Sequence, residues 1–283
     1  MSYRSLLVLL DQSASSAART DIAICLAKDM DCHLVGLAPA GLTQGSMMMG
    51  AVELAELANL AWAAQRDLAR QASQRFEAAC TAGGLKSFEA VVDDADTVVS
   101  LLAHARCSDL TVLTQADPAA SGHRQARALV EQAVLFSARP TLVIPYAGRL
   151  PTLGSSVMLA WDDSREAARA AADALPLLRR AGHVRVVSWN ESLAHGDPAL
   201  STRLAWVQKW LLWHGVSADV CVEAGGNNGQ VDVGEAMLSR AADLGIDLIV
   251  MGAYGHARWA EWMMGGATRG LLASATVPVL MSH

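Results

Sequence analysis

The sequence has 283 residues, which suits one large domain or two of ordinary size. Hydrophobic residues make up 52% of it and charged residues 18%, a composition typical of a well-buried globular protein and not of a disordered chain. The net charge of −6 argues against nucleic-acid binding, because neutralising phosphates requires a basic surface.

No segment has the character of a secretion signal or a membrane anchor. The apolar run before Asp11 is short, and no run approaches the roughly 18 residues that cross a bilayer. The five cysteines are scattered without a CxxC pair, which indicates neither a zinc site nor a disulfide framework. We therefore expect a cytoplasmic protein that binds neither membrane nor nucleic acid.

Apolar runs and helical patterns alternate along both halves of the chain. In the first half we expect strands near 5–11, 32–38, 87–93, 109–114 and 140–145, and helices near 15–29, 48–82, 96–106 and 124–137. In the second half we expect strands near 156–161, 184–189, 217–223, 247–252 and 278–282, and helices near 165–181, 200–214, 232–243 and 265–274. Continuous apolar strands are typical of parallel sheets covered on both faces. The pattern predicts two tandem doubly wound α/β domains, each with a parallel five-stranded sheet.

An internal repeat supports this division. Residues 5–13 match residues 156–164 at an offset of 151, and residues 109–113 match 247–251 at an offset of 138. The first half therefore has 13 extra residues, which we place in its long helical stretch from about Met48 to Thr81. We expect domains at 1–147 and 155–283, joined by a linker between them.

The lengthened helix is unusually apolar. Leu54, Leu57, Leu60 and Trp62 all lie within it. A helix extension of this kind supports packing more often than chemistry, so a contact with a partner or a second copy is one hypothesis for it.

The loop after the fourth strand of the second half is rich in glycine. It carries Gly252, Gly255, Gly265 and Gly266 ahead of an expected helix. In an open α/β sheet, ligands bind at the carboxyl ends of the strands, where the topology reverses. Glycines there allow a phosphate to approach the backbone, and the amides at a helix N-terminus favour an anion. Asp162, which ends the first strand of this half, would face the same crevice and accept a hydrogen bond from a base or ribose.

The G-x2-G-x9-G spacing of Gly252, Gly255 and Gly265 resembles the ATP-binding signature of the universal stress protein family. The first strand ending in Asp-x-Ser and the closing Val-Pro-Val-Leu-Met strand are also similar to that family, and the resemblance covers essentially the whole chain twice. It implies the Usp fold, which is Rossmann-like and similar to adenine nucleotide alpha-hydrolases. It also implies a stress-response regulator that binds ATP or a related adenine nucleotide, with Mg²⁺ accompanying the nucleotide.

The same resemblance implies roles for individual residues and partners. Asp162 would contact the nucleoside, the Trp189 main chain the adenine, and the amides of Gly252, Gly255 and Gly265 the phosphates and ribose. The two domains would pack as an intrachain pseudo-dimer through their final strands, and two chains would form a homodimer.

The glycine motif departs from the family pattern at one position. Gly266 stands where ATP-binding members carry Ser or Thr, so a hydroxyl donor to the terminal phosphate is missing, and Thr268 is the candidate substitute. Losing one such hydrogen bond costs roughly 1.5–3 kcal/mol. The alternative is that these glycines serve only the turn and the helix start.

The first half has lost the glycine motif. Applying the offset of 138, Gly252, Gly255 and Gly265 become Thr114, Asp117 and Arg127. A carboxylate at Asp117 would repel a phosphate, and side chains would block close backbone approach. We therefore expect a degenerate nucleotide site in the first domain.

Other features of the sequence point to packing rather than catalysis. Trp206, Trp210 and Trp213 lie at helical spacing, which favours a core or domain interface. Trp259 and Trp262, in the glycine loop, either pack on a neighbouring domain or cover a ligand.

No known catalytic motif is visible, so we do not expect an enzyme, although slow ATP hydrolysis stays open. The alternative function is a nucleotide-free scaffold or adaptor that acts through protein–protein contacts.

Overall fold

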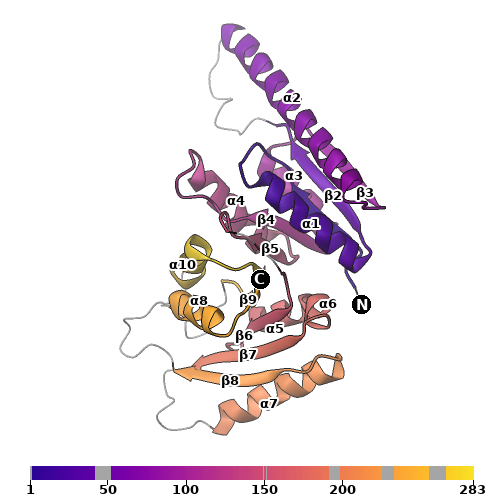
Figure 1. Cartoon of the computed structure of the whole chain (residues 1–283). Helices are drawn as coiled ribbons and strands as arrows, with labels where there is room; N and C mark the ends of the chain where they lie inside the picture. Colours follow the sequence, from indigo (N-terminus) through magenta and orange to yellow (C-terminus); the bar gives the residue numbers. More distant parts are fainter. Residues whose placement is uncertain are drawn as a thin grey trace. The chain divides into compact units, whose positions relative to one another are not determined.

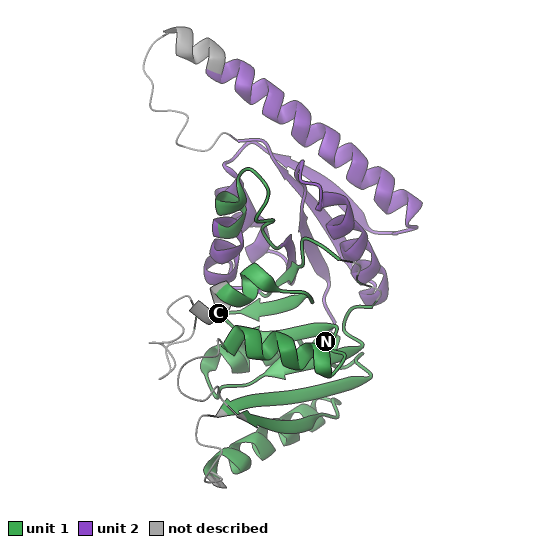
Figure 2. Cartoon of the chain, turned by 60° about the vertical axis from the view of Figure 1, so that its left-hand side comes forward, with its two compact units in different colours: residues 1, 115–127, 140–283 green, residues 2–114, 128–139 purple. Residues whose placement is uncertain are grey.

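The computed structural model describes residues 2–41, 52–148, 150, 152–190, 198–224, 233–254 and 266–283 (Figure 1). The chain forms two compact units, one of residues 2–114 with 128–139 and one of residues 115–127 with 140–283 (Figure 2). Residues 140–147 thus group with the second half, and the domain limits 1–147 and 155–283 stay a prediction from the sequence.

The first unit is built on four parallel strands in the order β3-β2-β1-β4. These are β1 (Ser5–Leu9), β2 (His33–Pro39), β3 (Phe88–Asp93) and β4 (Leu110–Thr114). The helices of this half are α1 (Ser16–Met30), α2 (Val52–Ala82), α3 (Thr97–Arg106) and α4 (His123–Phe136), the last of which is divided between the two units. The central strand β1 is a run of leucine and valine buried on both faces, which is why it carries no polar alternation.

The second unit has six strands in the order β5-β10-β9-β6-β7-β8. They are β5 (Thr141–Ile144), β6 (Ser156–Ala160), β7 (His183–Asn190), β8 (Asp219–Ala224), β9 (Leu248–Gly252) and β10 (Val279–Ser282). Pairing is parallel except between β5 and β10, the final strands of the two halves, which pair antiparallel as the resemblance implies. The described helices are α5 (Arg165–Asp173), α6 (Leu175–Leu178), α7 (Pro198–Trp213), α8 (Val233–Asp243) and α10 (Gly266–Ser274). Alternating strands and helices with mainly parallel pairing confirm the predicted α/β fold class.

One predicted helix is wrong as a single element. Residues 165–181 form two helices, α5 and α6, which meet at Ala174. Pro176 lies in the first turn of α6, where its missing N–H is tolerated, but it could not lie inside one continuous helix without removing a hydrogen bond and crowding the preceding turn.

The internal repeat is confirmed by matching contacts at the amino-terminal ends of the strands. The Asp109 carboxylate accepts hydrogen bonds from the backbone N–H groups of Arg4 and Ser5, at 2.7 and 3.1 Å. In the second half the Asp247 carboxylate accepts them from Ser155 and Ser156, at 3.0 and 2.9 Å. These residues are related by the offsets 151 and 138 seen in the sequence.

The extra length of the first half lies in α2, as predicted, although the excess in this helix is 15 residues (31 − 16) and not 13. This helix has 31 residues, whereas α7, its counterpart, has 16. Both end the same way, because Gly84 and Gly215 adopt left-handed φ values of 69° and 78° two residues after the last helical residue. Aligned on these glycines, α7 corresponds to residues 67–82, so residues 52–66 of α2 have no counterpart in the second half.

Candidate functional site

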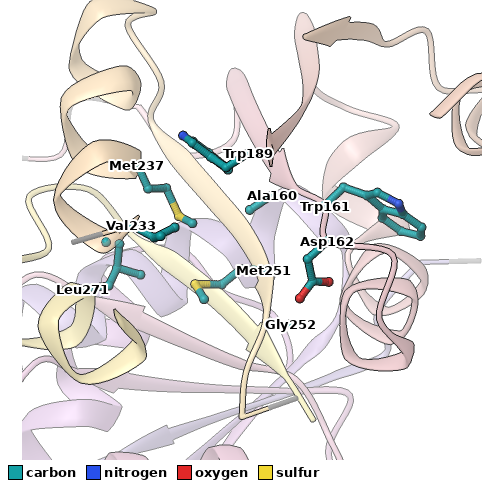
Figure 3. A pocket seen from close by; sticks show the side chains of 10 residues that line it. Ala160, Trp161, Asp162, Trp189, Val233, Met237, Met251, Gly252 and Leu271 are labelled. Carbon is teal, nitrogen blue, oxygen red and sulfur yellow. The ribbon is translucent and has the colours of Figure 1, made fainter. Parts of the chain in front are cut away.

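A pocket opens at the carboxyl ends of β6, β7 and β9 in the second unit (Figure 3). Its cavity volume is about 50 Å³, which is small beside the pockets that enclose a whole drug-sized ligand. Its lining residues are Ala160, Trp161, Asp162, Trp189, Val233, Gly234, Met237, Met251, Gly252 and Leu271. The structure thus brings together Asp162, Trp189 and Gly252, three of the residues that the sequence nominates.

Asp162 is the only charged residue among the described residues that line the pocket. Its Oδ1 accepts hydrogen bonds from the backbone N–H and the hydroxyl of Ser164, at 3.1 and 2.5 Å. The Ser164 hydroxyl in turn accepts from the N–H of Ala167 and caps α5. This turn holds the carboxylate at the end of β6 and leaves Oδ2 outside these bonds.

The rest of the pocket is an apolar slot. Trp189 lies at the end of β7, Met251 on β9, and Met237 and Leu271 on α8 and α10 (Figure 3). Flexible methionines beside a tryptophan suit a flat aromatic ligand, because thioethers adapt their shape and make favourable contacts with rings. The slot therefore offers apolar contacts for an aromatic group, with one carboxylate at its side that can accept from a hydroxyl donor.

Close packing against α5 explains why residue 252 is a glycine. A Cβ at this position would lie 2.5 Å from the backbone nitrogen of Ala167 and 2.6 Å from the carbonyl carbon of Glu166. The first turn of α5 therefore rests directly on the end of β9. The sequence suggested that the missing side chain of Gly252 makes room for a phosphate, whereas the structure shows that it makes room for the first turn of α5.

The first turn of α5 also carries a buried acid. The Glu166 carboxylate accepts a hydrogen bond from Arg165 Nε, and the residue is 2% exposed. Burial alone would raise the pKa of Glu166, but the hydrogen bonds from Arg165 and from the backbone of Glu166, together with the charges of Arg165 and His283, outweigh it and hold this pKa below the ordinary value. The carboxylate is thus kept ionised.

The backbone at the rim of the pocket adopts unusual conformations. Asp163, next to Asp162, has a φ of 65°, and Tyr254, two residues after Gly252, has a φ of 56°. For a bulky residue such as tyrosine this left-handed conformation is uncommon and costs energy. Their counterparts in the first half, Gln12 and Ala116, do not share it.

The rest of the predicted glycine motif is only partly covered by the structure. Gly255 and Gly265 lie outside the described residues, as do Trp259 and Trp262. Gly266 and Thr268 lie in the first turn of α10, whose nine residues begin at Gly266. The free N–H groups of that turn are the described feature suited to an anion.

In the first unit, an arginine side chain lies beside Asp11, the counterpart of Asp162. Arg19, on α1, is 3% exposed, and its Nη2 lies 2.9 Å from the Asp11 carboxylate. Its Nε donates to the Leu9 carbonyl and its Nη1 to the Thr114 hydroxyl, both at 2.9 Å. Burial would raise the pKa of Asp11, but the Arg19 charge and the hydrogen bonds from Ser13 and Arg19 hold it below the ordinary value. Asp11 and Thr114 are the counterparts of Asp162 and Gly252, so the guanidinium engages the residues that a ligand would meet.

Sequence reasoning did not find Arg19. It expected a degenerate first site because Thr114, Asp117 and Arg127 replace the motif glycines. The Asp117 carboxylate accepts the N–H of Ala119 in its own loop at 2.8 Å. The available signal was the repeat itself, because Arg19 aligns at the offset of 151 with Ala170, a fully buried alanine. A charged residue in place of a core alanine marks a position whose surroundings have changed.

The prediction for the tryptophans of α7 was wrong for two of three. Trp206 and Trp213 are 66% and 71% exposed, and the buried face of the helix consists of Leu204, Val207 and Leu211. Trp210 is half-buried and packs against His214, with ring centroids 4.6 Å apart. The three tryptophans do share one face of the helix, but that face is turned by about 120° from the one that Leu204, Val207 and Leu211 bury.

Two kinds of feature are absent from the described part of the chain. Among those residues, no three His, Cys, Asp or Glu side chains come together in a way that could hold a metal ion. No helix in the same ranges combines the length and apolar character needed to cross a membrane.

Comparison with known proteins assigns the second half to a family and the whole chain to a fold. The model of the universal stress protein family matches residues 155–283. No curated protein matches the sequence.

Solved structures match over nearly the whole chain. A universal stress protein from Archaeoglobus fulgidus DSM 4304 has a TM-score of 0.71 at 17% identity, covering 98% of this chain and 95% of that one. A functionally unknown protein from Pseudomonas aeruginosa PAO1 has a TM-score of 0.60 at 14% identity, covering 99% and 92%. A universal stress protein in complex with cAMP has a TM-score of 0.39 at 15% identity, covering 52% and 100%.

Proposed function

We propose that this chain is a stress-response regulator of the universal stress protein type, whose family model matches residues 155–283, and that its second domain binds ATP or a related adenine nucleotide. The observation that carries the proposal is the pocket at the strand ends, with an apolar slot and the single carboxylate of Asp162. Both the position in the fold and the chemistry of the lining suit a nucleoside.

The slot and the carboxylate match the two parts of a nucleoside. Trp189, Met237 and Met251 offer an apolar surface for the base. The Oδ2 atom of Asp162 can accept a hydrogen bond from a ribose hydroxyl, a bond to an ionised acceptor that is stronger than one between neutral groups. The left-handed backbone at Asp163 and Tyr254 supports the assignment, because such costly conformations gather at binding sites.

The phosphates would lie toward the start of α10. The N–H groups of its first turn and the positive end of its dipole favour an anion. Gly266 offers an amide there but no hydroxyl, so we expect ATP to bind about one to two orders of magnitude more weakly than with Ser or Thr at this position. Mg²⁺ would enter with the phosphates of the nucleotide.

Isothermal titration calorimetry tests the proposal, with ATP, AMP and cAMP as ligands in the presence and absence of Mg²⁺. We expect binding to the wild type and at least a tenfold weaker affinity for Asp162→Asn, because the amide has one acceptor oxygen and Ser164 already uses it. The matched control is Asp11→Asn in the first half, for which affinity should not change. Absence of heat with all three ligands at millimolar concentration would refute the proposal.

We propose a binding role in the cytoplasm rather than an enzymatic one. No recognised catalytic motif accompanies the pocket in the sequence. ATP hydrolysis by the purified protein above the rate without protein, lost in Asp162→Asn, would contradict this part.

A scaffold that needs no nucleotide is the second candidate. It is favoured by the exposed apolar residues of α7, where Trp206, Leu212 and Trp213 are all more than 60% exposed. This function predicts a bound protein that is lost when Trp206 and Trp213 become serine, together with a melting temperature that no nucleotide changes.

A further inference from the structure

A second cavity lies in the first unit, between α1 and α2, which pack next to each other. Its volume is about 300 Å³, at the lower end of the range of small-molecule sites. The pocket of the second unit is lined instead by α8 and α10, which correspond in chain order to α3 and α4. The cavity between α1 and α2 is therefore not a copy of the nucleotide pocket.

The helix α2 leaves this space open where its counterpart carries large side chains. Ala72 and Ala79 line the cavity, and in the alignment of α2 with α7 they correspond to Arg203 and Trp210. The Arg203 Nε atom lies 2.9 Å from the carboxylate of Asp163, at the start of the second half's first helix. The two copies of the fold thus differ in the room that they leave between these helices.

The helix α1 turns polar groups toward the same cavity. Thr20 and Asp21 line it, and at the offset of 151 they correspond to Ala171 and Ala172. Thr20 is 6% exposed, and its hydroxyl forms no hydrogen bond with any residue that the structure describes. A buried hydroxyl without a partner is costly, so a polar atom of a ligand in the cavity would satisfy it.

The start of α1 lacks the cap that its counterpart has. In α5 the Ser164 hydroxyl accepts the N–H of Ala167, whereas α1 has no side-chain cap and no acidic residue in its first turn. The N–H of Ala17, which lines the cavity, has no acceptor within the described ranges. Free N–H groups at the start of this 15-residue helix favour an anion.

Arg75 adds a positive charge at the same end of the cavity. Its Nη2 donates to the side-chain oxygen of Gln12 at 2.7 Å, and the Gln12 amide nitrogen donates to the Leu68 carbonyl at 2.9 Å. Gln12 comes shortly before α1, so these bonds hold the guanidinium near the start of that helix. Nε and Nη1 of Arg75 have no partner in the part of the chain that the structure describes, and they can donate to a carboxylate.

Asp21 supplies the opposite charge further along α1. It comes one turn after Ala17, about 6 Å along the helix axis, and helical side chains lean back toward the N-terminus. Its carboxylate pairs with no cation among the described residues. The other acid of the lining, Asp11, already pairs with Arg19. The cavity therefore has one cationic end and one anionic end.

We propose that the first unit binds a small zwitterion, a free amino acid, in the cavity between α1 and α2. Its carboxylate accepts hydrogen bonds from Arg75 and from the N–H of Ala17, and its ammonium donates to Asp21 and Thr20. Phe76 of α2 lines the cavity and gives an apolar wall for the side chain of the ligand. Two charge-assisted contacts support a dissociation constant below about 1 mM.

Thermal unfolding of the full chain with each of the common amino acids, at about 10 mM, tests the proposal. At least one should raise the melting temperature, and calorimetry then gives its affinity. The methyl ester of that amino acid lacks the carboxylate and its N-acetyl derivative lacks the ammonium, so each should bind at least tenfold more weakly. A protein that no amino acid stabilises refutes the proposal, and an N-acetyl derivative that binds equally well shows that the ligand is only an anion.

Charge removal tests the two ends of the cavity. Arg75→Gln and Asp21→Asn should each weaken binding of the amino acid at least tenfold. The matched controls are Arg70→Gln and Asp29→Asn, exposed residues of the same two helices outside the cavity, and they should leave the affinity unchanged. Equal losses in the variants and in their controls would mean that the ligand binds elsewhere.

Filling the cavity tests its place in the fold. Ala79→Trp introduces the side chain that the second half has at this position and should abolish binding, with an unchanged circular dichroism spectrum. Thr20→Val keeps the shape of the residue without its hydroxyl and should weaken binding about tenfold if the tryptophan variant does not fold. Binding that both variants leave intact overturns the proposal. Asp162→Asn should not change it, so this site and the nucleotide pocket are tested separately.

Discussion

The crevices of the two halves each have an aspartate at the end of their first strand, Asp11 and Asp162, and they differ in which residues face it. In the first half Asp11 pairs with Arg19, which also bonds to Thr114. In the second half the aligned residues are Asp162, Ala170 and Gly252, so the aligned helix position supplies no cation, although a pocket lies beside the aspartate in both halves. A cation supplied by the helix satisfies the first aspartate, whereas the second keeps an oxygen for a ligand. One helix position can thus change the charge that faces the same aspartate in the two copies of a duplicated fold.

Replacing Arg19 by alanine, the residue at its aligned position, should have the largest effect on stability. The change removes a buried cation and two hydrogen bonds and leaves Asp11 without its partner. Breaking a buried pair costs about 3–5 kcal/mol, and we expect the lower end, about 3 kcal/mol, because the Asp11 side chain is 38% exposed. Urea unfolding followed by circular dichroism measures it.

The control for this experiment is Arg4→Ala, an exposed arginine that should change the free energy of unfolding by less than about 0.5 kcal/mol. If Arg19→Ala costs less than 1 kcal/mol, the first crevice does not depend on the arginine and the contrast between the two halves fails.

The strand-end residues facing each aspartate should respond differently to alanine. Gly252→Ala drives a Cβ into the backbone of α5 and should cost about 2 kcal/mol through overpacking. Thr114→Ala removes only the hydrogen bond to Arg19 and should cost about 1 kcal/mol. Thermal unfolding of both variants gives the comparison. Equal costs would mean that α5 moves to accept the methyl group.

The smallest expected effect is a difference in acid stability. The pKa of Asp11 is held below its ordinary value near 3.8, so its ionised form stabilises the folded state above that pH. This stabilisation is lost as the pH falls through the lowered pKa of the folded state. The unfolding free energy of the wild type should therefore fall more steeply between pH 5 and pH 3 than that of Asp11→Asn. Parallel curves for the two proteins would show that Arg19 does not stabilise the carboxylate.

Much of the architecture could be predicted because it depends on local patterns. The strands β1 and β6 are short apolar runs that end in Asp-x-Ser, and their repeat gave the offsets that matched the two halves. The same comparison located the extra residues in α2. Where local patterns compete, prediction failed, as at Pro176, which divides the expected helix 165–181 in two.

The candidate site was predicted in part. Asp162, Trp189 and Gly252 follow from the rule that ligands bind at the carboxyl ends of parallel strands, and the structure brings them to one pocket. Met237 and Leu271 could not be nominated, because an apolar residue on a helix looks the same in sequence whether it lines a pocket or fills the core. The exposure of Trp206 and Trp213 was missed for the same reason.

The sequence by itself determined that the fold is duplicated, where each strand lies to within a few residues, and which half keeps a glycine-rich loop, because these depend on neighbours along the chain. Only the tertiary structure decided that Arg19 reaches Asp11 and Thr114, and that Gly252 is needed by α5. Those contacts join residues up to about a hundred positions apart, and their energy depends on distances and burial that no local pattern encodes.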